Sequence, residues 1–433
     1  MSQTVPDVPS IPYGVNNGYG NYPPARPGPH YAQSTGAYSV ARDKVLQGRA
    51  VKQVELFQGN LVLDVPVSSH IIPAGRQDVE EMSEMHYTAA TCDPDDFLKS
   101  RYSLRPYLLG RQTELFIVMT MYNKDEHSVL KNIAHLCGRS KSKTWGSEGW
   151  KKVVVCVVSD GHSKINKRAL QVLSLMGCYQ DGIAKDSVAG KDVTAHIFEY
   201  TSSVMVTELG EVSQTGCSIQ IIFSLKEQNK KKLNSHRWFF SAFGPLIKPN
   251  VCVLLDVGTK PTGTSIHELW KCFDKHSNVG GACGEICVDT GRGCSLLLTR
   301  PLAASQNFEY KMSNILDKPL ENGPDGKGPL PASYFKGETM HGGGPNGAGL
   351  FERNMHLVED CILRFEIVTT KQEEWVLKYA KSAKASTNVP ASVPEFISPR
   401  RRWLNGSLFA SIHSTVFWFK IWTSGQNFFR KSF

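Results

Sequence analysis

The chain has 433 residues, 41% of them apolar, and a formal net charge of +9 at pH 7. This length corresponds to two or three domains, or to one large α/β domain with additions, and the apolar content can build a sizeable core. The basic excess suits anionic ligands such as nucleotide diphosphates, an anionic membrane surface or nucleic acid, and equally a solvated surface rich in lysine. No stretch reaches the ~20 apolar residues of a membrane-spanning helix, so we expect no such helix in these residues.

Eleven cysteines are spread along the chain, and its polar, Pro-rich start shows no secretory signal. Reduced thiols in a cytosolic setting are therefore expected. Cys283 and Cys287 are four apart, with Cys294 beyond them, which is not a zinc-ribbon spacing. The pattern favours buried thiols on strands over a metal site.

The first hundred residues differ in composition from the rest. Residues 1–40 are rich in Pro, Gly, Tyr, Ser and Asn, and because these bury little surface we expect a disordered tail. Residues 41–110 hold short β-like pieces such as 60–64, which we interpret as an N-terminal extension packed on the main domain.

From Glu114 onward, short and mostly apolar runs alternate with helical patterns. Such runs are typical of strands buried on both faces, and they occur at 115–119, 153–158, 195–198, 219–223 and 251–255. Helical patterns fall at 125–137, 164–176 and 228–243. The alternation predicts an α/β fold with an open, mainly parallel sheet flanked by helices.

Polar or small residues follow three of these runs directly, at 120–123, 159–161 and 256–260. Ligands of open parallel sheets bind outside the carboxyl ends of the strands. Asp256 stands at such an end, where its carboxylate is a suitable oxygen ligand for Mg²⁺ or Mn²⁺. That ion could bridge a diphosphate and neutralise its charge. The alternative is that Asp256 or Thr259 caps a following helix.

Two further acidic sites have equally plain alternatives. Asp160, followed by Gly161, could hydrogen-bond the base or ribose of a nucleotide while Lys164 reaches a phosphate, but Asp-Gly is also a common turn. In the pair Glu359-Asp360, a carboxylate could act as general base on a hydroxyl group. The pair could equally be two acids at a helix end.

Near the end of the chain, the run 400–403 reads Arg-Arg-Arg-Trp. Clustered guanidinium groups suit a diphosphate and an indole face suits a sugar ring, although a basic helix face at a membrane is the alternative. Apolar residues then recur at helical spacing, at Leu408, Phe409, Ile412, Val416 and Phe419. Either an amphipathic helix in the membrane interface or a buried core helix fits this stripe.

Four longer stretches in this order resemble fungal chitin synthases, as do the shorter runs 256–261 and 281–286. The stretches are 111–122, 226–238, 306–317 and 400–406. The resemblance extends from about residue 40 to residue 430. It implies a GT-A glycosyltransferase fold that moves N-acetylglucosamine from UDP-N-acetylglucosamine to the 4-hydroxyl of a growing β-1,4 chitin chain, with inversion.

The resemblance also implies roles for single residues. The uridine would be held by Thr120, Tyr122 and Asp160, and the divalent metal by Asp256. The base would be Asp360. The diphosphate and the acceptor end would be held by Arg401, Arg402 and Trp403. The corresponding domains are a tail at 1–40, a chitin synthase N-terminal region at 41–110, a GT-A domain at 111–406 and an amphipathic helix at 407–433.

The partners implied are the sugar nucleotide, the chitin chain and, through 407–433, the membrane surface at the cytoplasmic face of the plasma membrane. A second copy of the chain, in a homo-oligomer, is a further possible partner. Nucleic acid is not expected, because the basic stretch 229–232 has no aromatic stacking platform beside it.

The chain departs from the family pattern at several points. Lys124, His162, Cys361 and Pro399 replace the family's usual Glu, Arg, Arg and Gln, and Pro399 also lacks a backbone donor. A segment of the acceptor channel that the family places soon after 317–321 is missing. Nucleotide binding is therefore a safer expectation than polymer synthesis, and the alternative function is a truncated or non-catalytic relative that binds nucleotide or a partner synthase.

Overall fold

The structure is a computed structural model, and it describes residues 56–72, 79–122, 145–146, 148–206, 212–256, 258–262, 264–290, 299–316, 359–371, 373–390 and 392–426. The chain divides into two compact units, 1–54 and 55–433. The first unit lies outside the described residues, as do the expected tail at 1–40 and the expected helix at 125–137. Everything below concerns the second unit.

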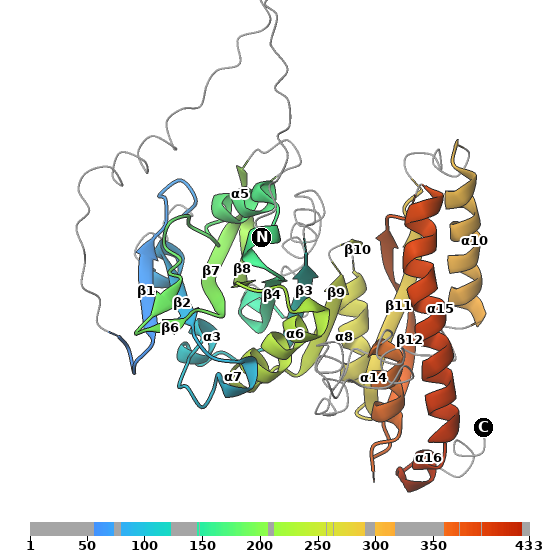
Figure 1. Cartoon of the computed structure of the whole chain (residues 1–433). Coiled ribbons are helices and arrows are strands. Elements are labelled where there is room, and N and C mark those ends of the chain that lie inside the picture. Colours follow the sequence, from blue (N-terminus) through green and yellow to red (C-terminus); the bar gives the residue numbers. More distant parts are fainter. Residues whose placement is uncertain are drawn as a thin grey trace, which may run out of the picture. The chain divides into compact units, whose positions relative to one another are not determined.

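A seven-stranded sheet forms the larger part of this unit (Figure 1). Its strands, in spatial order, are β1 (Leu61–Pro66), β2 (Glu84–Ala90), β7 (Ala195–Val206), β8 (Val212–Lys226), β4 (Val153–Ser159), β3 (Leu115–Met121) and β9 (Val251–Asp256). The last four run parallel to one another, whereas β1, β2 and β7 are antiparallel to their neighbours. The predicted α/β fold with a largely parallel sheet is confirmed, and β1 and β2 belong to the same sheet as β3.

Strand β3 shows why the apolar runs read as strands buried on both faces. Successive side chains of a strand point to opposite faces, and here Phe116 and Ile117 enter two different cores. On the side of Ile117, α5 (Lys167–Leu175) contributes Val172 and Leu173. On the side of Phe116, the ring stacks on Phe239 with centroids 4.0 Å apart.

The helix expected at 228–243 is present with a different internal geometry. It begins at α6 (Lys231–Arg237), because the side chain of Asn229 accepts the backbone N–H of Lys231 in a turn before it. It continues as a π-helix (Trp238–Phe243) and ends in α7 (Gly244–Ile247). The wider turn places a run of aromatic side chains against the sheet.

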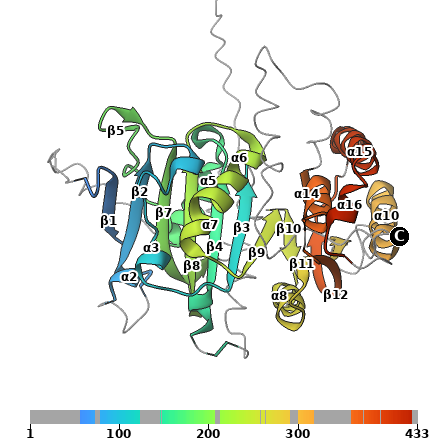
Figure 2. The ribbon, with the colours of Figure 1, turned by 90° about the horizontal axis from the view of Figure 1, so that it is seen from below.

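A second, three-stranded sheet has the order β10 (Thr259–Pro261), β12 (Val376–Thr387), β11 (Val279–Val288). Figure 2 shows α8 (Ser265–Lys275) on one side of it and the other helices of this region on the opposite side. Those helices are α10 (Pro301–Leu316), α14 (Glu359–Val368), α15 (Val393–Val416) and α16 (Lys420–Thr423). Among the described residues, no helix combines the length and the apolarity that crossing a bilayer requires.

The remaining elements are short and connect the larger ones. They are α2 (Glu80–Ser83), α3 (Arg105–Leu108), β5 (Ser187–Val188), β6 (Lys191–Asp192), and the 3₁₀ turns η1 (Pro94–Asp96), η2 (Gly149–Lys152) and η3 (His162–Lys164). The cysteines that the structure describes carry free thiols, and Cys283 and Cys287 are partly buried on β11. Cys294 lies outside the described residues.

Candidate active site

The carboxyl ends of three parallel strands meet at one edge of the large sheet. Thr120 of β3 is the register partner of Asp256 of β9, and Met121 is the partner of Ser159 at the end of β4. The backbone N–H of Asp160 donates to the carbonyl oxygen of Met121 at 2.9 Å. The polar residues that follow these strands therefore lie together, as their positions in the sequence predict.

Asp256 is open to solvent at this edge. Its side chain is 67% exposed, and one carboxylate oxygen lies 3.4 Å from Nζ of Lys232. The interpretation of Asp256 or Thr259 as a helix cap is wrong, because β10 follows and the next described helix, α8, has Thr264 as its N-cap residue. A solvent-accessible carboxylate held at a strand end is free to bind a cation.

A cavity of about 220 Å³ opens beside Asp256. Its walls come from the end of β9, from β10, from α8, and from β11 and β12, with Lys232, Arg364 and Lys384 as the basic residues. Pockets for complete drug-sized ligands have volumes of ~300–1,000 Å³, so this space is smaller than a pocket that encloses a whole ligand of that size. Residues of both sheets therefore line the cavity, at the edge where Asp256 lies.

Asp160 occupies a different environment, because it is buried in an ion pair. One of its carboxylate oxygens lies 2.7 Å from Nζ of Lys226 and accepts the backbone N–H of Lys230 at 3.0 Å. Lys226 also donates to the side-chain oxygen of Asn234 at 2.9 Å. Gly161 follows with a φ of 98° and lies so close to Asn229 that an added Cβ would be 3.3 Å from that side chain. The turn is thus fixed by the ion pair and by the glycine.

The other donor-side candidates border this turn. Thr120 is partly buried at the end of β3, and Tyr122, directly after that strand, is 47% exposed. Lys164 is exposed in η3, after the Asp160 turn. These side chains are accessible at the same strand edge, so they can meet one ligand.

Asp360 is the second residue of α14. Its side chain lies outside the described residues, so only its place in the helix is known. Arg364 of the same helix lines the cavity beside Asp256. The start of α14 thus belongs to the same region as Asp256.

The arginine cluster lies elsewhere, on α15. Arg400 makes a bidentate ion pair with Glu309 of α10 and lies over the ring of Trp403 at 5.8 Å. Arg401 and Arg402 are exposed, and neither they nor Trp403 are among the described residues that line the cavity. The structure therefore does not bring these three side chains to Asp256.

The apolar stripe of α15 faces solvent. Leu408 is 59% exposed and Val416 57% exposed, and Ile412 and Phe419 are exposed as well. Arg401 stands seven positions before Leu408, which places it on this face. Phe409 is half-buried, and the other four residues of the stripe are exposed, so the described residues do not form the buried core helix that was the alternative.

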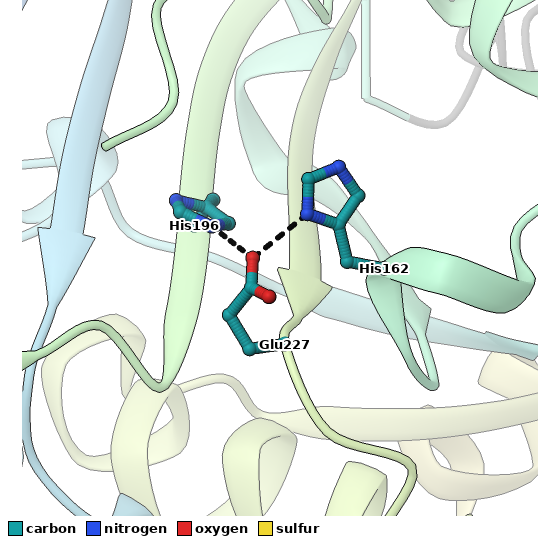
Figure 3. A group of neighbouring side chains, drawn as sticks. All are labelled: His162, His196 and Glu227. Atoms are coloured by element: carbon teal, nitrogen blue, oxygen red, sulfur yellow. Dashed lines mark hydrogen bonds and ion pairs between the residues drawn. The ribbon is translucent and has the colours of Figure 1, made fainter. Parts of the chain in front are cut away.

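A further group of side chains, His162, His196 and Glu227, could not be recognised from the sequence. Glu227, directly after β8, accepts hydrogen bonds through a single carboxylate oxygen from Nδ1 of His162 at 2.8 Å and from Nε2 of His196 at 2.6 Å (Figure 3). These residues are far apart in the sequence, so no metal-ligand spacing signals them. The one sign was His162 itself, which departs from the family's Arg.

The sequence of this chain matches two family models of known proteins. The family model described as a chitin synthase-like glycosyltransferase domain matches residues 115–323 and 321–418, and the model described as chitin synthase N-terminal matches 49–114. The two pieces of the first match meet where the sequence analysis places the missing segment.

Three curated relatives share more than half of their aligned residues with this chain. Chitin synthase 2 of Mycosarcoma maydis is 58% identical over 90% of this chain and 38% of its own length. Chitin synthase 2 of Cryptococcus neoformans var. grubii is 56% identical over 95% of this chain and 47% of its own length. Chitin synthase 2 of Rhizopus oligosporus is 52% identical over 93% of this chain and 50% of its own length. The chain spans half or less of the length of these relatives. By the family match and these identities, the chain belongs to the chitin synthase family of glycosyltransferases.

Proposed function

We propose that this chain binds UDP-N-acetylglucosamine and transfers its sugar to the 4-hydroxyl of a growing β-1,4 chitin chain, with inversion. The observation that carries this proposal is the convergence of Thr120, Asp160 and Asp256 at one strand edge, where Asp256 also lines a cavity. Ligands of open parallel sheets bind at such edges.

Asp256 would hold the divalent cation, Mg²⁺ or Mn²⁺. Mg²⁺ is commonly bound through one or two carboxylates together with substrate phosphates, and the exposed carboxylate of Asp256 beside an open cavity fits that donor set. When bound, the cation stabilises the negative charge on the departing diphosphate. Lys232, within 3.4 Å of Asp256, would contact the same phosphates.

The base would come from α14. Asp360 would accept the proton of the acceptor hydroxyl as that oxygen attacks the sugar. The helix that carries Asp360 also contributes Arg364 to the wall of the cavity, which supports a position near the transferred sugar. Thr120, Tyr122 and Asp160 would hold the uridine, and Lys164 would contact a phosphate.

The α15 residues receive a second candidate role. Arg401, Arg402 and Trp403 would bind the diphosphate and the acceptor end by family resemblance, yet they lie on an exposed helix with an apolar stripe. An amphipathic face with adjacent arginines binds anionic membrane surfaces. We therefore propose that 407–433 contacts the membrane, at the cytoplasmic face of the plasma membrane.

The domain boundaries and the assembly state are proposed with this function. The boundaries are a tail at 1–40, an N-terminal region at 41–110, a GT-A domain at 111–406 and the interfacial helix at 407–433. The chitin chain is the second substrate, the chain assembles as a homo-oligomer, and nucleic acid is not a partner.

The alternative function is a truncated or non-catalytic relative that binds nucleotide or a partner synthase without making polymer. The position where the two family matches meet, 321–323, favours it, because the acceptor segment expected there is missing. Incorporation of labelled sugar into insoluble polymer by membranes that carry this chain distinguishes the two. Incorporation that is lost in Asp360→Asn supports synthesis, and no incorporation alongside intact nucleotide binding supports the alternative.

Nucleotide binding itself is tested by titrating the purified chain with UDP in the presence of Mn²⁺. Asp256→Asn should weaken this binding at least about tenfold, or ~1.4 kcal/mol, because it removes the anionic ligand. The matched control is Asp274→Asn at the exposed end of α8. Equal affinities in the two variants would overturn the assignment of Asp256.

A further inference from the structure

We propose that His162, His196 and Glu227 form a second divalent metal site, selective for Zn²⁺ over Mg²⁺ and separate from Asp256. The potential ligand atoms of the three residues all lie within 4.8 Å of one another. They come from η3, from β7 and from the residue after β8, so an ion here would connect three segments (Figure 3). The proposal does not depend on the sugar-transfer reaction.

The donor set decides the type of metal. Two imidazole nitrogens with one carboxylate suit Zn²⁺ and similar transition metals, whereas Mg²⁺ prefers oxygen ligands only. Two histidines and a glutamate are also a known ligand set of zinc sites that keep a fourth position for water. That position is accessible here, because the side chains of His162 and Glu227 are 37% and 30% exposed while His196 is fully buried.

Admitting the ion requires the side chains to move, because the two imidazole nitrogens, which lie within 4.8 Å of each other, and the carboxylate oxygen must all reach the tetrahedral spacing. Tetrahedral ligands at zinc-to-nitrogen distances of ~2.0–2.1 Å lie about 3.3 Å apart. The two nitrogen-to-oxygen distances are 2.8 and 2.6 Å. The carboxylate of Glu227 would therefore separate from each ring by roughly 0.5–0.7 Å. The partly exposed side chains of His162 and Glu227 can make that adjustment.

A second layer of contacts positions the buried ligand. Nδ1 of His196 is 2.9 Å from the hydroxyl oxygen of Tyr87, which also accepts the backbone N–H of Lys185 at 3.3 Å. Without the ion, the Nε2–H of His196 donates to Glu227, so zinc binding would require this proton to leave Nε2 and the other ring nitrogen, Nδ1, to donate to Tyr87. Such outer contacts fix the orientation of metal-binding histidines.

Bound Zn²⁺ would fix the loop that carries Asp160. His162 is two positions after Asp160, and its backbone N–H already donates to the carbonyl oxygen of Glu227 at 3.4 Å. An ion would add bonds between the same segments. We expect Zn²⁺ to raise the thermal stability of the chain, since a ligand that binds only the folded state stabilises it.

The test uses the full chain with Zn²⁺ alone and no nucleotide. Competition titration with a coloured chelator gives the zinc affinity, and Co²⁺ substitution gives the absorption of the metal and its ligands. The variant His162→Arg places a guanidinium group beside the carboxylate of Glu227, so it should fold like the unmodified chain. It should lose zinc affinity by about 10- to 100-fold or more, the loss typical of disrupted metal sites.

The control is His276→Ala, an exposed histidine after α8. It should keep both the zinc affinity and the zinc-dependent rise in melting temperature. Two results would overturn the proposal: equal zinc affinity in His162→Arg and the unmodified chain, or a Co²⁺ spectrum dominated by thiolate ligands. Either result would mean that zinc binds elsewhere, for example at free cysteines, and that His162, His196 and Glu227 are joined by hydrogen bonds alone.

Discussion

The ammonium nitrogen of Lys226 lies 2.7 Å from a carboxylate oxygen of Asp160, and the two side chains are only 2% and 8% exposed. Removing one partner of a buried ion pair leaves an uncompensated charge in the interior. We expect Asp160→Ala to lower the free energy of unfolding by about 3–5 kcal/mol. Urea unfolding followed by tryptophan fluorescence measures the change.

A double variant separates charge from packing. Adding Lys226→Met to Asp160→Ala removes the stranded ammonium group, so part of the lost stability should return. Asp274→Ala, at an exposed position, serves as the control. A single variant no less stable than this control would show that water reaches the pair and that burial does not govern it.

Gly284 supports the wall of the cavity. It sits at an irregularity in the pairing of β11 with β12, where an added Cβ would overlap the backbone of Ala383. We expect Gly284→Ala to separate the strands and to cost about 1–3 kcal/mol of unfolding free energy. Gly258→Ala is the matched control, since a Cβ there meets nothing within 4 Å. Thermal melts that fail to distinguish the two variants would contradict this account.

His236 should make stability depend on pH. Burial, followed by the charges of Lys232 and Lys226, lowers its pKa to about 3. The unfolded chain binds this proton near pH 6.5 and the folded chain does not until about pH 3. The free energy of unfolding therefore falls by about 1.4 kcal/mol per pH unit as the pH decreases through that range.

The variant His236→Gln removes this contribution. Chemical denaturation at a series of pH values from 7.5 downward should give a shallower slope for the variant than for the unmodified chain. Parallel slopes would mean that His236 takes up its proton in the folded state.

The exposed stripe of α15 predicts binding to membranes. A charged side chain at position 408 would oppose insertion of α15 into the membrane interface. It would also remove the favourable free energy of burying a leucine side chain there, which is ~1.5–3 kcal/mol. We expect Leu408→Glu to reduce co-sedimentation with anionic vesicles at least about tenfold. Leu109→Glu, at a position 48% exposed just after α3, is the control. A similar loss in both variants would assign the effect to net charge and not to α15.

The central strands could be predicted because their signal is local. Strands buried on both faces are continuous apolar runs, and β3, β4 and β9 begin where those runs begin. Strands β7 and β8 extend beyond the runs 195–198 and 219–223, because polar side chains such as Thr201 and Ser202 are also buried in them. Gln220 is a buried polar residue within the second run. Gln220 is satisfied by backbone carbonyl groups of η2 and β4, and no pattern within one strand reveals such partners.

The candidate site could be predicted in part for the same reason. Strand ends are visible in the sequence, so Thr120, Asp160 and Asp256 were found. The partners of these residues were not, because Lys226 and Lys232 reach them from segments distant in sequence. The cluster around Glu227 depends entirely on the pairing of β7 with β8. The roles of the site residues remain predictions.

The pairing of β2 with β7 sets a limit on how the protein can be shortened. Five register pairs, from His86 with Glu199 to Ala90 with Ala195, join the two strands. A fragment starting at residue 111 would leave the backbone groups of β7 unsatisfied along a sheet edge, which promotes aggregation. Soluble fragments should therefore begin ahead of β1, so that the N-terminal strands cover the sheet edge at β7.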